Sequence, residues 1–152
     1  MTFYILTEDD ASVIGTGMSG NWKELDERDA RVVAFKASMC WLQIKAERER
    51  RTEQGGFKVG AKWLHSDRKS RNQQLALALL GENIPAELQW KTMDGSFVAM
   101  TQALAQQILV AGAANDQAIF AAAEAHKAAM EASADPLSYD FSGGWPEAFE
   151  GA

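Results

Sequence analysis

The chain has 152 residues, of which 47% are hydrophobic, and it carries a formal net charge of −6. This length suits one domain with a modest core, and no segment approaches the roughly 18 consecutive apolar residues that favour a membrane span. The N-terminal residues turn acidic after a short apolar run, so a signal peptide is not expected.

Two short strands are predicted at the N-terminus, over Thr2–Leu6 and Ser12–Gly15, with an acidic turn at Glu8-Asp9-Asp10 between them. An isolated hairpin is marginal in water, so this one needs another element to pack against. The first long helix is predicted to begin at Asn21, because Asn21 and Glu24 have the spacing of a capping box.

This first helix is expected to end at Gly55-Gly56 and to bury one apolar face. The residues of that face, at helical spacing, are Trp22, Leu25, Val32, Val33, Phe35, Met39, Leu42 and Ala46. Cys40 lies in the same run, which predicts a buried free thiol in a reducing compartment. Beyond Lys45 the apolar face fades, so this end of the helix is expected either to be solvated or to pack on another subunit.

Two units in which a β-ribbon precedes a helix follow in tandem. Residues 57–64 alternate as a half-buried hairpin around a central glycine. The helix after it is predicted from Arg68 to Leu80, with Ser66 or Asp67 as its cap and Gly81 as its end.

The second ribbon is predicted over Leu88–Met93 and Ser96–Thr101, joined by a two-residue type I′ turn at Asp94-Gly95. That register places Trp90 opposite Ala99 and, on the same face, Thr92 opposite Phe97. We expect five residues of the two ribbons to act as structural anchors: Trp63, Trp90, Asp94, Gly95 and Phe97.

Thr101 has the hydroxyl needed to cap the last helix, predicted from Gln102 to about Ala132. One face of this helix is formed by Leu104, Ile108, Ala111, Asn115, Ile119 and Ala122. Asp135-Pro136 closes the helix. The acidic tail that follows is expected to dock on its own domain or on a partner through four aromatic residues: Tyr139, Phe141, Trp145 and Phe149.

Together these elements predict an α+β fold, in which short antiparallel β-hairpins alternate with three helices and the N-terminal and C-terminal helices are long. The expected organisation is an N-terminal β-hairpin and helical arm (1–54), a hairpin-helix-hairpin-helix domain (55–134) and an aromatic, acidic tail (135–152). The helix surface exceeds what one small core can cover, so an oligomer is expected.

No constellation in the sequence predicts catalysis or a cofactor. His65, Ser66 and Asp67 are the residue types of a nucleophilic triad, but consecutive residues do not converge on one reacting atom. Two histidines and one cysteine are too few for a usual structural zinc site, and nucleotide-binding and calcium-binding motifs are absent from the sequence. We therefore expect a protein that is not an enzyme and needs no cofactor or metal.

Charge is distributed unevenly along the chain. The segment from Lys45 to Arg71 has nine basic and four acidic residues, a local charge of +5, which leaves −11 for the rest. Such a segment suits a nucleic acid or an acidic protein, but the acidic total disfavours binding to a phosphate backbone.

Three segments, KVGAKWLHSDRKSR, LQWKTMDGSFVAMT and ADPLSYDFSGGWP, resemble an uncharacterised domain family encoded by tailed bacteriophages and prophages. Members of that family lie in tail-fibre regions and are often labelled tail-fibre-assembly-like. The resemblance covers roughly Ala46 to Pro146 and brings no catalytic residues with it. It implies a protein that binds a tail-fibre or tail-tip polypeptide, in the host cytoplasm during assembly or as a component of the virion tail.

Two hypotheses follow. In the first, the chain is a fibre-associated protein, either an assembly chaperone or a virion subunit, and acts by covering strand edges and apolar surface of its partner. In the second, it is a small phage effector that binds a host protein or a nucleic acid through the +5 segment and exposed aromatic residues.

Overall fold

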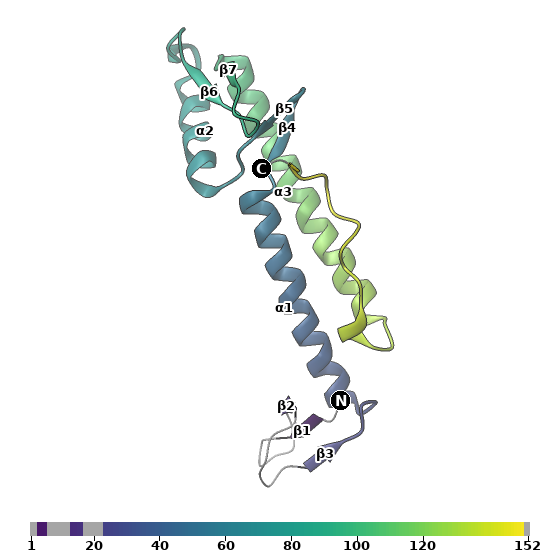
Figure 1. The fold of residues 1–152 in the computed structure, drawn as a ribbon. Coiled ribbons are helices and arrows are strands. Elements are labelled where there is room, and N and C mark those ends of the chain that lie inside the picture. Colours follow the sequence, from purple (N-terminus) through teal and green to yellow (C-terminus); the bar gives the residue numbers. More distant parts are fainter. Residues whose placement is uncertain (1–2, 6–12, 17–22, 151–152) are drawn as a thin grey trace. The chain divides into compact units, whose positions relative to one another are not determined.

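The computed structural model describes residues 3–5, 13–16 and 23–150 of the chain (Figure 1). Within them, three α-helices and short antiparallel strand pairs confirm the predicted α+β class. In chain order the elements are β1 (Phe3–Ile5), β2 (Val13–Thr16), β3 (Lys23–Leu25), α1 (Ala30–Gln54), β4 (Phe57–Val59), β5 (Lys62–Leu64), α2 (Arg68–Leu80), the 3₁₀ turn η1 (Gly81–Asn83), β6 (Gln89–Lys91), β7 (Phe97–Ala99), α3 (Gln102–Glu131) and η2 (Pro136–Ser138).

Backbone contacts divide the chain into two compact units. Unit 1 comprises Met1–Lys45 and Glu124–Gly143, and unit 2 comprises Ala46–Ala123 and Gly144–Ala152. Both long helices contribute to both units, so the units differ from the three consecutive segments expected from the sequence. None of the helices in the described part of the chain is long and apolar enough to cross a membrane.

The N-terminal strands form an antiparallel sheet in the order β2-β1-β3. The third strand was not predicted, and it makes the predicted helix start wrong, because Lys23–Leu25 pairs with β1. Asn21, Trp22 and the acidic turn at Glu8-Asp9-Asp10 lie outside the described residues. The helix begins instead after Asp29, whose carboxylate accepts a hydrogen bond from the Arg31 backbone N–H at 2.9 Å.

The buried face of α1 also differs from the predicted one. It consists of Val32, Lys36, Cys40 and Ile44 at four-residue spacing, whereas Met39 and Leu42 are exposed. Because a lysine lies in the middle of this face, the face does not show an unbroken apolar periodicity in the sequence. Lys36 is tolerated there because its Nζ donates to Asp135 at 3.1 Å, within unit 1.

Cys40 is 1% exposed, which confirms the predicted buried thiol, and burial raises its pKa. We therefore expect Cys40 to react with a thiol reagent such as dithionitrobenzoate at least tenfold more slowly in the folded protein than in denaturant. The time course of absorbance at pH 8, with and without urea, measures the ratio. A native rate close to the denatured one would contradict the burial of this side chain.

The first ribbon and the helix after it follow the prediction closely. β4 and β5 pair with Phe57 opposite Leu64, and α2 has the predicted bounds. Asp67 is the cap of α2, since its carboxylate accepts from the Ser70 N–H at 2.9 Å. Ser66 was the alternative cap and is not used as one: its buried Oγ accepts from the Gly56 N–H at 3.0 Å.

The second ribbon is present, but its predicted register is wrong. β6 and β7 pair Trp90 with Val98 and Lys91 with Phe97. Thr92 N donates to Ser96 O at 2.8 Å, and Gly95 N donates to Thr92 O at 3.0 Å, so residues 93–95 form a three-residue loop. Gly95 takes the positive φ of +83° that such a loop requires at its last position.

Asp94 explains why the longer loop is preferred. Its carboxylate accepts hydrogen bonds from the Ser96 N–H at 2.9 Å and from the hydroxyls of Ser96 and Thr92, both at 2.6 Å. These bonds, led by those from the two hydroxyls, hold the pKa of Asp94 well below its usual range. These three hydrogen bonds to the Asp94 carboxylate stabilise the three-residue loop relative to a two-residue turn.

The last helix agrees with the sequence. Thr101 caps it, accepting from the Leu104 N–H at 3.1 Å, and Ile108 and Ile119 of the predicted face are buried. The core of unit 2 lies where this helix meets the two ribbons and α2. Its buried residues are Phe57, Leu64, Met100, Ala105 and Ile108.

Candidate protein-binding surface

The β4–β5 ribbon presents two different faces, because successive strand residues point to opposite sides. Phe57 and Leu64 are buried in the core of unit 2. On the other face Lys58 and Trp63 pair across the strands, and the Lys58 ammonium lies 5.1 Å from the centre of the Trp63 ring. The outer edge of β5 is joined to the second ribbon, since Met93 N donates to Trp63 O at 2.9 Å.

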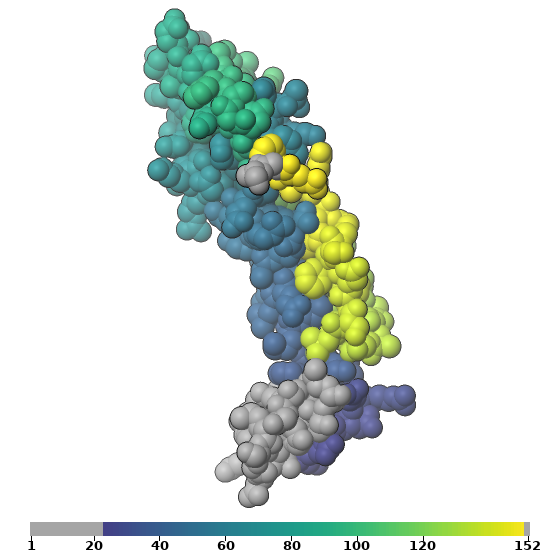
Figure 2. Space-filling model, viewed as in Figure 1, coloured from purple at the N-terminus to yellow at the C-terminus, as the bar shows by residue number. Residues whose placement is uncertain are grey.

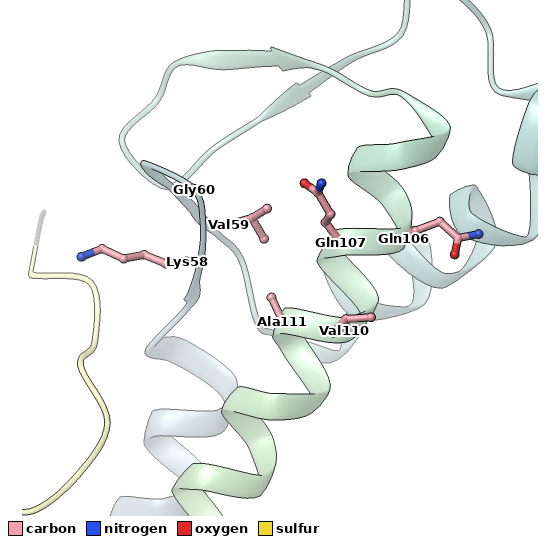
Figure 3. Close-up of a pocket in the computed structure, with 7 residues that line it drawn as sticks. All are labelled: Lys58, Val59, Gly60, Gln106, Gln107, Val110 and Ala111. Carbon is pink, nitrogen blue, oxygen red and sulfur yellow. The ribbon is translucent and has the colours of Figure 1, made fainter.

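A shallow groove of about 470 Å³ lies between β4 and the first turns of α3. Figure 3 shows Val59 pointing toward α3, while Lys58 points away, toward the C-terminal end of the chain. The apolar surface of the groove comes from Val59, Val110 and Ala111, and the amides of Gln106 and Gln107 border it. Val110 is 72% exposed, so apolar surface is open to solvent here.

Residues 144–150, here called the C-terminal segment, belong to unit 2 and are the last of the residues coloured yellow in Figure 2. Phe149 N donates to Gly55 O at 2.8 Å, and the Phe149 ring lies 5.9 Å from the Trp63 ring, measured between centroids. Arg51 binds the segment twice: its Nη1 donates to Pro146 O at 3.2 Å, and its guanidinium lies 5.2 Å from the centre of the Trp145 ring.

The C-terminal segment does not fill the space between itself and the rest of unit 2. A cavity of about 340 Å³ remains beside it, bounded by the ribbon, α3 and the segment. Its lining residues are Phe57, Lys58, Trp63, Ala111, Ala114, Asn115, Pro146 and Glu147.

The basic side chains of the +5 segment largely have acidic neighbours. The ion pairs in unit 2 are Arg50–Glu47 at 2.8 Å, Arg51–Glu47 at 2.6 Å, Lys58–Glu147 at 3.0 Å, Lys62–Asp94 at 3.2 Å and Arg71–Asp116 at 3.5 Å. A hydrogen bond from Arg50 is the main cause that lowers the pKa of Glu47, whereas burial raises that of Asp116 against the effect of Arg71. This pairing reduces the positive field available to a nucleic acid.

His65, Ser66 and Asp67 have separate structural roles. The carbonyl of His65 accepts from Gln74 Nε2 at 2.9 Å, and the other two side chains bond to Gly56 and Ser70 as described above. Among the residues that the structure describes, no group of three or more His, Cys, Asp and Glu side chains is placed to hold a metal ion.

The predicted anchors occupy three different environments. Trp63 and Trp90 are half-buried, and Trp90 packs against the core of unit 2. Asp94 and Gly95 form the loop of the second ribbon. Phe97 is 62% exposed, so its prediction as an anchor is wrong, because the observed register turns its side chain to the surface. The sequence reasoning did not identify Phe57 as an anchor, although it is the largest fully buried side chain among the residues whose burial the structure describes.

The four aromatic residues predicted as partner contacts are all half-buried in their own chain. In unit 1, the Tyr139 hydroxyl lies 2.9 Å from His126 Nδ1. In unit 2, Trp145 and Phe149 contact Arg51 and Trp63. Of the two alternatives left open by the sequence, docking on the same chain is therefore the one observed.

Comparison with known proteins places this chain in one family. No curated protein and no solved structure matches it. Residues 36–143, well over half of the chain, match the model of a family described as "Domain of unknown function (DUF4376)". That region holds most of α1, both ribbons, α2 and all of α3. The chain belongs to the DUF4376 family.

Proposed function

We propose that this chain is a tail-fibre-associated protein of tailed bacteriophages, which binds a fibre or tail-tip polypeptide as an assembly chaperone or a virion subunit. The observation that carries the proposal is the open apolar groove between β4 and α3. The resemblance of the ribbon and tail motifs to the tail-fibre-assembly-like domains supplies the identity of the partner.

The groove has the chemistry of a site for an extended polypeptide. Val59, Val110 and Ala111 offer apolar surface to one side chain of the partner, and Gln106 and Gln107 offer amides that can exchange hydrogen bonds with its peptide groups. A fibre chain that has not yet trimerised exposes strand edges and apolar side chains of this kind. Covering them keeps such a chain from aggregating.

Co-expression with the fibre polypeptide encoded next to this chain tests the proposal. We expect the two proteins to co-purify, and Val110→Asp to weaken the complex at least tenfold in a titration, because a charge replaces apolar surface that lines the groove. Isothermal titration calorimetry gives the affinity of each variant.

Leu79→Asp is the matched control. Leu79 is 80% exposed on α2, outside the groove, so the same change of charge should leave the affinity unchanged. Separate elution of the two wild-type proteins, or equal losses for both variants, would reject the groove as the fibre-binding site. A salt-dependent shift of nucleic acid by the chain alone would favour the effector hypothesis instead.

A further inference from the structure

We propose that the Lys58–Trp63 face of the ribbon, together with Arg51, is a recognition site for an extended peptide with an aromatic-apolar-acidic-x-aromatic pattern, in which Pro146 is the apolar residue of the resident segment. The C-terminal segment of the same chain is its resident ligand and must leave before a partner peptide of this chemistry binds. This inference does not rest on the proposed function, since Val110 and the two groove glutamines take no part in it.

The contacts of the segment repeat every second residue. Trp145 lies against Arg51, Glu147 pairs with Lys58 at 3.0 Å, and Phe149 lies against Trp63. This period of two is the spacing at which an extended chain presents alternate side chains to one surface. Sites that bind extended peptides recognise them in this way, with side-chain pockets and a few main-chain hydrogen bonds.

The main chain of the segment is also bound by the rest of unit 2. Arg51 donates to the Pro146 carbonyl, and Gly55 O accepts from Phe149 N. The segment has no regular secondary structure of its own. The residues that bind it come from the end of α1, from β4 and from β5, so the site is built from three elements of unit 2.

The way the segment is attached allows it to leave. Unit 1 ends at Gly143 and unit 2 resumes at Gly144, which has a φ of +80°. Both glycines are exposed, and a side chain at position 143 would meet nothing within 4 Å. Release of the segment therefore requires rotation at these two glycines and leaves the ribbon itself in place.

The resident segment is also an imperfect ligand. Its ion pair is solvent-exposed on both sides and screened by salt, so it adds specificity more than affinity. The cavity of about 340 Å³ beside Pro146 and Glu147 is left unfilled. A partner peptide with a larger apolar side chain at the Pro146 position gains burial that the resident does not have.

Binding of a labelled peptide to the full-length chain tests the site. The probe is a fluorescein-labelled heptapeptide with the sequence of residues 144–150, followed by fluorescence anisotropy. We expect the double variant Trp145→Ala/Phe149→Ala to bind it at least tenfold more tightly than the wild type, in which the resident segment competes at a high effective concentration. A scrambled peptide of the same composition should not bind.

A charge exchange tests whether Lys58 binds the acidic residue of the peptide, at the Glu147 position. In the double variant, Lys58→Glu should weaken binding of the peptide severalfold, and a peptide carrying lysine at the Glu147 position should restore it. If circular dichroism shows the double variant to be unfolded, full-length Trp145→Ala takes its place, since it removes the contact with Arg51 and leaves Phe149 on Trp63. Equal affinity of the wild type and the loosened variant, or equal binding of the scrambled peptide, would overturn the proposal.

Discussion

Replacement of Phe57 by alanine is expected to destabilise the protein by about 3–5 kcal/mol, the range for removal of a buried phenylalanine from a packed core. Phe57 is 2% exposed and lies opposite Leu64 in the first ribbon. The Arg71 guanidinium lies 5.1 Å from the centre of its ring. Truncation therefore leaves a cavity and removes the cation–π contact with Arg71. The aliphatic part of the Arg71 side chain also loses the ring as a packing partner.

Phe97→Ala is the matched control for this prediction, because it removes the same atoms from a strand of the second ribbon. Phe97 is 62% exposed, so its loss should change stability by less than about 1 kcal/mol. Urea denaturation followed by far-ultraviolet circular dichroism gives the free energy of unfolding of both variants, with one common slope for its dependence on urea concentration. Equal losses at the two positions, or a larger one at Phe97, would show that the second ribbon and not the first holds the core.

The contrast between these two phenylalanines shows what the sequence could and could not predict. Signals carried by neighbouring residues were read correctly: the bounds of α2, its end at Gly81, the first ribbon, and the cap and extent of α3. A cap needs only the few residues that form it, so its chemistry is visible in a short window. The loop of the second ribbon is equally local, but its length was predicted wrongly, because Asp94-Gly95 suits a two-residue turn and the hydrogen bonds of the Asp94 carboxylate favour the longer loop.

Features that depend on distant residues were missed. The buried face of α1 contains Lys36, which is stabilised by Asp135, 99 residues further along the chain. β3 exists because it pairs with β1, and no local pattern distinguished it from the start of a helix. Long-range pairing overrides local propensity in both cases.

The candidate binding surface was predictable only in outline. The composition of the tail indicated that its aromatic residues dock, but not that Trp145 lies on Arg51 and Phe149 on Trp63. Those contacts join residues more than 80 positions apart. The groove at Val59 and Val110 likewise joins a strand to a helix that no sequence window contains together.

The two faces of the first ribbon separate the two proposed binding activities physically. One face of β4 carries Val59 at the groove, and the other carries Lys58 under the C-terminal segment. Lys58 also borders the groove, whereas Val110 has no part in binding the C-terminal segment, so Val110 is the position at which the groove is tested without altering the other surface. Both surfaces depend on the ribbon keeping its position against the core.

Gly56 lies where the two ribbons approach each other closely, and Gly56→Ala is expected to destabilise the protein by about 2–4 kcal/mol. Gly56 has a φ of +66°, which is strained for alanine. A Cβ there would overlap Met93 Sδ and would lie 3.0 Å from the Leu64 carbonyl oxygen. Met93 can move, but Leu64 O belongs to the paired β5 backbone and cannot do so without disturbing the ribbon.

Gly60→Ala separates the two causes of this expected loss. Gly60 has nearly the same φ, +61°, but a Cβ there would meet nothing within 4 Å. Its cost should be the conformational strain alone, about 1 kcal/mol. In thermal unfolding, the Gly56 variant should therefore melt several degrees below the Gly60 variant. Coincident melting curves would mean that the close approach of the two ribbons to Gly56 adds nothing to the loss of stability. The first ribbon would then be held in place by its turn instead.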